Sequence, residues 1–234
     1  MRTKIRKIII RVSLLSSILL IFPAFRIAAQ EKIKFGVFAD PVISWFSSDT
    51  KETKNDGSRA GFNFGLNFNS YFAPNYAFST GLNILNAGGR LINNTTDTLI
   101  MKFNNFSDSV MPGMAVTYKA RYLSIPIGLK FKSNQIGYIT FFTDIGLDPK
   151  FLIGAKADIP SRDIEGETAT NELNTFNMSF HIMAGIEYSL GGSTSMVFGL
   201  GFENNFLDVT KELNNQPSDK IKMKLLKLRL GINF

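Results

Sequence analysis

The sequence has no cysteine and a single histidine, His181, among its 234 residues. Without cysteine the chain can form no disulfide, offer no thiol nucleophile and build no cysteine-ligated metal site. One histidine is likewise a poor basis for a zinc site, which usually takes several histidine or cysteine ligands. We therefore expect neither a metal site nor a cofactor-binding site.

Long apolar runs are also scarce, because no stretch beyond residue 30 stays apolar and uncharged for about 18 residues. The one apolar run, residues 12–25, follows a basic start and precedes the small residues of "RIAAQ". This layout is typical of a secretory signal peptide, and the run is short for a spanning helix, which needs about 20 residues. We expect a cleaved signal peptide at residues 1–30 and one domain at residues 31–234, with an uncleaved membrane anchor as the alternative.

Strong charge of one sign is absent from the predicted mature chain, although the whole sequence carries a formal net charge of +7. Six of the 26 Lys and Arg residues, and none of the 19 Asp and Glu residues, fall in the first thirty positions. Removing them leaves 20 basic against 19 acidic residues. A nearly neutral chain lacks the basic patch of nucleic-acid-binding proteins, so we expect no nucleic-acid partner.

Large apolar side chains alternate with small polar ones along almost the whole domain. In "AGFNFGLNF", residues 60–68, Phe62, Phe64 and Leu66 share one face of a strand, while Asn63 and its glycine neighbours share the other. Period-two alternation of this kind predicts strands, and almost no helical period is found after residue 31. The eight predicted strands span residues 33–46, 59–70, 76–91, 115–131, 136–155, 174–190, 194–206 and 220–234.

The connections between these strands alternate between long and short. The long, polar ones are residues 47–58, 92–114, 156–173 and 207–219. The short ones, which carry the Pro, Asn and Gly that tight turns need, are residues 72–75, 132–135 and 191–193. Up-and-down topology puts all long loops at one end, as in outer-membrane barrels with short periplasmic turns and long outer loops.

A closed barrel explains why large apolar side chains could face outward. In lipid every backbone polar group must be paired within the protein, and a barrel has no unpaired edge. Eight strands enclose a lumen that side chains can fill. A soluble barrel of lipocalin type is the alternative, since alternation alone does not say which face points inward. The unequal loops and the Gly, Asn and Ser face favour an all-β, eight-stranded antiparallel up-and-down transmembrane β-barrel in the bacterial outer membrane.

Aromatic residues gather near the ends of the predicted strands, where headgroup depth suits their rings. At the turn end these are Tyr71, Phe72, Tyr76, Tyr138 and Tyr188, and at the loop end they are Trp45 and Phe46.

His181 lies on the predicted luminal face, two residues from Ser179. A hydrolase could use this pair with a carboxylate, but residues two apart on a strand lack the convergent geometry of a triad. A site in the middle of the lumen would also be closed to substrate. We therefore predict no catalytic residue, and instead a luminal network of hydrogen bonds and ion pairs. Its other expected members are Asp144, Glu187, Glu203, Lys130, Lys227 and Arg229.

Two smaller features allow alternatives. Asp144 and Asp148 share one face of "DIGLDP" and could begin an ion site near the outer mouth, although solvated strand ends explain them equally well. Pro126 and Pro149 lie inside predicted strands, where proline is normally confined to edges and bulges. We expect a bulge at each of them and no chemical role.

Three strands carry a resemblance to a known family. "YLSIPIGLKF", residues 122–131, resembles the Tyr-Leu-x-Ile-Pro strand of the PorT-like outer-membrane barrel family, and "FHIMAGIEYSL", residues 180–190, is similar to its Gly-x-Glu-aromatic strand. "KLLKLRLGINF", ending at Phe234, resembles the terminal signal read by the barrel-insertion machinery. The first strand, "IKFGVFADPVISWF", lacks the family's glycine-rich start.

The resemblance implies an eight-stranded barrel of the OmpX/OmpA type, and it suggests an accessory role in type IX-like secretion, the process associated with the name-giving member. Asp97-Thr98-Leu99 and Asp108-Ser109-Val110 resemble the O-glycosylation acceptors of the family's relatives.

Our principal functional hypothesis is a non-enzymatic scaffold that presents four outer loops to secretion or surface proteins, with outer-membrane lipid and the insertion machinery as further partners. The alternatives are the secretion accessory, a narrow pore, and a lipid-modifying barrel enzyme. The enzyme would need exposed Ser, His and acidic residues near the outer leaflet, which the sequence does not supply.

Overall fold

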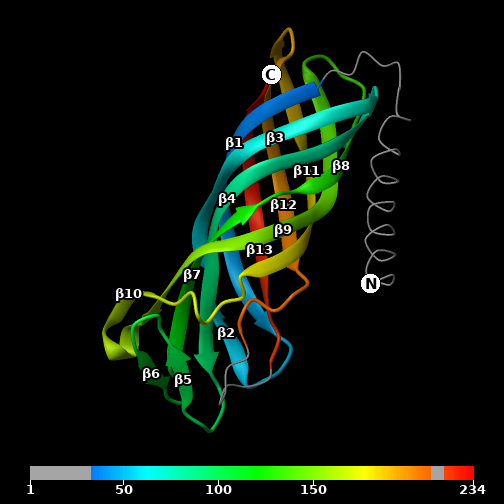
Figure 1. The fold of residues 1–234 in the computed structure, drawn as a ribbon. Coiled ribbons are helices and arrows are strands. Elements are labelled where there is room, and N and C mark those ends of the chain that lie inside the picture. Colours follow the sequence, from blue (N-terminus) through cyan, green and yellow to red (C-terminus); the bar gives the residue numbers. More distant parts are fainter. Residues whose placement is uncertain (1–32, 212–218) are drawn as a thin grey trace, which may run out of the picture. The chain divides into compact units, whose positions relative to one another are not determined.

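The computed structural model describes residues 33–211 and 219–234, which form an antiparallel barrel (Figure 1). The predicted signal peptide, residues 1–30, lies outside the described residues. The strands of the barrel wall are β1 (Ile33–Ser48), β3 (Arg59–Ala73), β4 (Tyr76–Asn93), β7 (Ala115–Ser124) continued by β8 (Ile127–Lys132), β9 (Ile139–Ile159), β11 (Phe176–Gly191), β12 (Thr194–Asn205) and β13 (Ile221–Asn233).

The wall closes because its first and last strands pair with each other. The antiparallel register of β1 with β13 runs from Gly36 opposite Asn233 to Ser48 opposite Ile221. Every other wall strand pairs with its neighbours in sequence, so the topology is the predicted up-and-down ring of eight. No helix among the described residues is long and apolar enough to cross a membrane.

The outward face is apolar, as the alternation predicted. On β3, Phe62, Phe64 and Leu66 are each 43% exposed, whereas Asn63, between two of them, is only 2% exposed. The same pattern holds on β13, where Leu226 and Leu228 face outward and Lys227 is buried. An apolar outer surface of this extent is stable in the hydrocarbon of a bilayer, because its side chains contact lipid tails and not water.

The long connections lie together at the end opposite the short turns, as predicted, but they are more ordered than their polar composition suggested (Figure 1). A short strand, β2 (Thr53–Gly57), pairs with β4, and β10 (Ile164–Thr168) pairs with β9 after a turn of 3-10 helix, η2 (Pro160–Arg162). The longest connection folds into a hairpin of β5 (Leu99–Lys102) and β6 (Ser107–Val110). At this end the wall strands and the described parts of these connections thus form one continuous structure.

The lumen changes character along its length. The Gly, Asn and Ser face led us to expect a polar lumen, but the loop-end part of the lumen is an apolar core. The ring of Phe46 meets that of Tyr118 edge-on at 6.2 Å between centroids, and Met101 and Phe103 from the β5–β6 hairpin are buried against the same cluster. Where the wall extends beyond the bilayer, water surrounds it, and an apolar interior becomes favourable as in a soluble protein.

Two aromatics predicted at the membrane interfaces turn inward instead. Phe46, only 1% exposed, belongs to the apolar core, and the Tyr71 ring lies 5.4 Å from the ammonium group of Lys132, with its hydroxyl buried. Both residues lie on the luminal side of the alternation. Of the others, Tyr138 and Tyr188 are exposed at the turn end as predicted, with ring centroids 5.9 Å apart.

The prolines interrupt pairing less than expected. Pro126 separates β7 from β8, but the register against β9 is the same on both sides of it. Pro149 pairs within an unbroken register with β11, and its carbonyl accepts a hydrogen bond from Ile125 N at 3.0 Å, so the predicted bulge there is wrong. The register of β7 against β9 shifts instead between Arg121 and Tyr122.

The outward orientation predicts a depth-dependent cost for charge. Leu66→Lys on β3 should lower the free energy of unfolding by about 2–4 kcal/mol, because the ammonium group would lie in hydrocarbon. Leu207→Lys is the matched control, since Leu207 is also 43% exposed but lies beyond β12 in a connection. Urea unfolding in lipid vesicles measures both, and equal costs would contradict the orientation.

Candidate functional site

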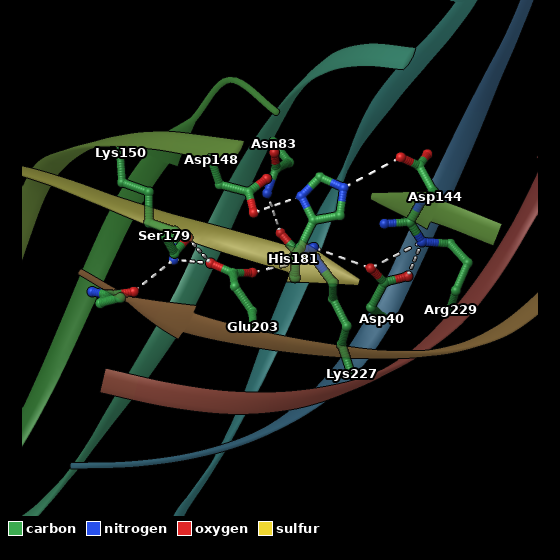
Figure 2. Close-up of polar contacts among 12 residues, drawn as sticks. Asp40, Asn83, Asp144, Asp148, Lys150, Ser179, His181, Glu203, Lys227 and Arg229 are labelled. Carbon is green, nitrogen blue, oxygen red and sulfur yellow. Dashed lines mark hydrogen bonds and ion pairs between the residues drawn. The ribbon is translucent and has the colours of Figure 1, made fainter. Parts of the chain in front are cut away.

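The turn-end part of the lumen is filled by charged and polar side chains that come from every wall strand. Figure 2 shows those around Glu203, His181 and Asp40. Most of them are less than a tenth exposed, and a polar group that is buried in this way requires a partner. The buried members are Asp40, Asn63, Asn83, Lys130, Asp148, Lys150, Ser179, His181, Glu187, Glu203, Lys227 and Asn233.

Glu203 of β12 is the centre of one cluster. Its carboxylate forms ion pairs with Lys150 of β9 and, at 3.2 Å, with Lys227 of β13. The Ser179 hydroxyl donates a hydrogen bond to it at 2.6 Å, and Lys150 Nζ also donates to the Asn205 side chain at 3.3 Å. Charge-assisted hydrogen bonds of this kind compensate the cost of burying three charges together.

His181 of β11 lies between two carboxylates of β9. Its Nδ1 is 2.8 Å from Asp148 and its Nε2 is 3.3 Å from Asp144 (Figure 2). Asp144 also accepts a hydrogen bond from the Ser79 hydroxyl of β4 at 2.8 Å. The imidazole ring is therefore fixed from both sides by the neighbouring strand β9, and Asp144 connects it further to β4.

Asp40 of β1 organises a third cluster. Arg229 Nε of β13 donates to its two oxygens at 2.8 and 3.1 Å, and the guanidinium carbon lies 3.8 Å from the centre of the Phe38 ring. The Asn63 amide donates to Asp40 at 3.0 Å and accepts from Asn83 at 2.6 Å. These contacts join four strands, β13, β1, β3 and β4. They therefore stabilise the pairing of β1 with β13 that closes the wall.

Glu187 of β11 holds the last cluster, nearest the short turns. Lys130 and Lys132 of β8 donate to its two oxygens at 2.6 and 2.5 Å, and the Asn233 amide donates at 3.2 Å. Lys130 Nζ also lies 4.4 Å from the centre of the Phe142 ring. Together the four clusters close the turn-end lumen with fixed, opposite charges.

This geometry decides between the chemical alternatives. Ser179 donates to Glu203 rather than to His181, whose two nitrogens are occupied by aspartates, so no nucleophile–base pair is formed.

The predicted network is confirmed for Lys130, Lys227 and Arg229. The alternative of an ion site at the outer mouth is wrong, because Asp144 and Asp148 flank His181 inside the lumen.

The described residues contain no cluster of three or more His, Asp or Glu side chains placed to hold an ion. The two cavities beside the polar network measure about 40 and 20 Å³. Such volumes suit a few water molecules.

Sequence reasoning missed Asp40, Lys132 and Lys150 as members of the network. A usable signal existed for Lys150, because it follows Asp148 by two positions and therefore shares its luminal face. The same signal existed for Lys132, which follows Lys130 by two positions, whereas the pairing of Asp40 with Arg229 depends on the register between distant strands.

The two tripeptides that resemble glycosylation acceptors lie at the β5–β6 hairpin. Thr98 is exposed just before β5, whereas the Ser109 hydroxyl on β6 accepts a hydrogen bond from Arg162 Nη2 at 2.6 Å. Modification at either remains a prediction.

Residues 28–224 match the family model described as "Outer membrane protein beta-barrel domain". No curated protein matches the chain. Among solved structures, Neisserial surface protein A is similar at 14% identity and a TM-score of 0.45, covering 85% of this chain and 95% of that one. OprG from Pseudomonas aeruginosa is similar at 12% identity and a TM-score of 0.42, with coverages of 87% and 95%. The Escherichia coli outer membrane protease OmpT is similar at 12% identity and a TM-score of 0.41, with coverages of 88% and 97%.

The network predicts that Glu203→Gln is strongly destabilising, because Lys150 and Lys227 would stay buried without their counter-charge. The expected loss in the free energy of unfolding is on the order of 3–5 kcal/mol. Glu165→Gln on β10 removes an exposed carboxylate and should change little. Denaturant unfolding in detergent micelles measures both variants, and a near-neutral Glu203→Gln would show that the ion pairs are not structural.

Proposed function

The chain belongs to the outer membrane protein β-barrel domain family, and from this premise we propose that it is a closed, non-enzymatic scaffold that presents ordered outer loops to other proteins. Its location is the bacterial outer membrane. The observation that carries the proposal is the combination of a filled lumen with structured loops. A filled lumen argues against transport, and structured loops offer a surface that needs little ordering before it binds.

The filling of the lumen supports the scaffold over a pore. Besides the two cavities in the polar network, the described residues enclose a cavity of about 60 Å³ in the apolar part, lined by Leu91, Met101 and Tyr118 among others. The Glu203 and Glu187 clusters lie between this apolar core and the turn end. A conducting path would have to break both clusters.

The loops support the proposal because they are tied to the barrel and to each other. Met101 and Phe103 of the hairpin region are 3% and 4% exposed within the apolar core. The Lys102 backbone N–H donates to Glu172 at 2.5 Å, and the Asn104 backbone N–H donates to the Thr168 carbonyl at 3.0 Å. Rigid scaffolds with loops held in this way are where binding surfaces usually lie.

A role as an accessory of a secretion machine is the second candidate, and its support is the resemblance of the strands at 122–131 and 180–190 to the PorT-like family. The enzyme alternative is disfavoured because Ser179 and His181 are buried in the lumen, away from any lipid substrate. Recognition of the strand ending at Phe234 by the insertion machinery remains a prediction.

The filled lumen predicts that the protein does not conduct ions across a bilayer. Purified protein reconstituted into planar bilayers should give no single-channel steps, because paired charged side chains fill the turn-end lumen and the cavities beside them measure about 40 and 20 Å³. A general porin reconstituted in the same way is the positive control. Reproducible conductance steps from this protein would contradict the closed scaffold and favour the narrow pore.

The scaffold predicts contacts with proteins at the loops. A photo-crosslinking amino acid at Met111, which is 46% exposed beside the hairpin, should capture one or a few discrete proteins in living cells. The same group at Ile136, 68% exposed in a short turn, is the control for chance contacts. Captured secretion components would favour the second candidate, and equal patterns at both positions would contradict presentation by the loops.

A further inference from the structure

The outward face changes from apolar to basic at one level of the wall. Going toward the loops, Leu123 on β7 is followed on the same face by Arg121, and Ile153 on β9 is followed by Lys156. The register aligns these changes, because Arg121 lies opposite Gly154 and Lys119 lies opposite Lys156. Such a border is expected where hydrocarbon ends and lipid headgroups begin.

A groove lies at this border, across the outer side of β7 and β9. Its volume is about 470 Å³, far larger than the cavities of the lumen. Four cationic residues line it, and no acidic residue does. Ile153 forms its apolar edge, and Gly154 leaves its floor without a side chain. The cationic residues are Arg59, Lys119, Arg121 and Lys156.

The positive charge of this groove is only partly compensated. Lys119 forms an ion pair with Asp158, and Arg121 Nε donates to the Asn86 side chain at 3.0 Å. Among the described residues, Arg59, Arg121 and Lys156 form no ion pair within 4.0 Å, although Asp158, the partner of Lys119, also attracts the Arg59 guanidinium group. Excess cations lining one concave surface attract anions and raise their local concentration.

We propose that this groove binds the phosphate groups of a lipid in the outer leaflet. Guanidinium groups match the geometry of phosphate oxygens, and lysines add compact charge beside them. The apolar surface directly below the groove includes Phe62 and Phe151, each 43% exposed, and Ile153, 52% exposed. A ligand that is anionic at one end and acylated at the other fits both surfaces, whereas a soluble anion uses only the first.

The proposal is independent of the scaffold role, and β13 supplies a matched control for it. Lys222 and Lys224 lie on the outward face near the same border, where Lys224 is opposite Trp45, but they do not line the groove. Neutralising Lys222 and Lys224 changes the charge of the outer rim by the same amount as neutralising Arg121 and Lys156.

The test compares the two pairs of substitutions in protein purified from outer membranes and reconstituted in phosphatidylcholine nanodiscs. Diphosphoryl lipid A is titrated, and its occupancy is measured by native mass spectrometry. Arg121→Gln with Lys156→Gln should weaken binding roughly tenfold, while Lys222→Gln with Lys224→Gln should leave it within about twofold. Equal losses in the two variants, or no loss in the first, would overturn the proposal. Heat-modifiable gel migration establishes that each variant is a folded barrel.

Two further arms identify the source of the phosphate. Lipid A stripped of both phosphates should bind the wild type at least tenfold more weakly, because the cations would then lack their ligand. Inorganic pyrophosphate in excess should leave most of the diphosphoryl lipid bound, since it cannot use the apolar surface. Equal binding of the dephosphorylated lipid, or full displacement by pyrophosphate, would contradict a lipid phosphate site.

Discussion

The whole structure depends on the pairing of β1 with β13. In hydrocarbon an unpaired backbone N–H or C=O costs several kcal/mol, so strands of this length are tolerated only if the sheet has no edge. Closure then fixes everything that follows: one face of each strand must meet lipid and the other must fill a narrow interior. The register from Gly36 opposite Asn233 to Ser48 opposite Ile221 meets this requirement along nearly all of β1.

The lumen is packed in two different ways, with paired charged side chains at the turn end and apolar side chains at the loop end. In the turn-end part, every strand crosses lipid, and small residues such as Gly and Asn leave room for long charged side chains that pair across the lumen. Glu203, Asp40 and Glu187 each join strands that are not consecutive in sequence, whereas His181 joins the neighbouring strands β9 and β11. In the loop-end part water surrounds the wall, and apolar side chains supplied partly by the hairpin fill the same space.

The sequence predicted best those features that depend on residues close together in the chain. Alternation predicted the eight wall strands, because a period of two can be read from consecutive residues. The unequal lengths of the connections and the Gly, Asn and Ser face predicted which face points outward and at which end the long loops gather. It did not predict the apolar part of the lumen, since Met101 and Phe103 come from a connection whose composition reads as a polar loop. Nor could it predict that Arg229 pairs with Asp40 or that Pro149 leaves the register intact, because both depend on how distant strands align.

The apolar core at the loop end has a consequence for how the protein reaches its final state. The segments that build this core, from residues 99–110 to Leu173 and Val209, can come together only on the far side of the bilayer. They must therefore cross as open chain and consolidate afterwards. Once these apolar side chains are packed, the free energy of their burial opposes withdrawal of the connections through the bilayer.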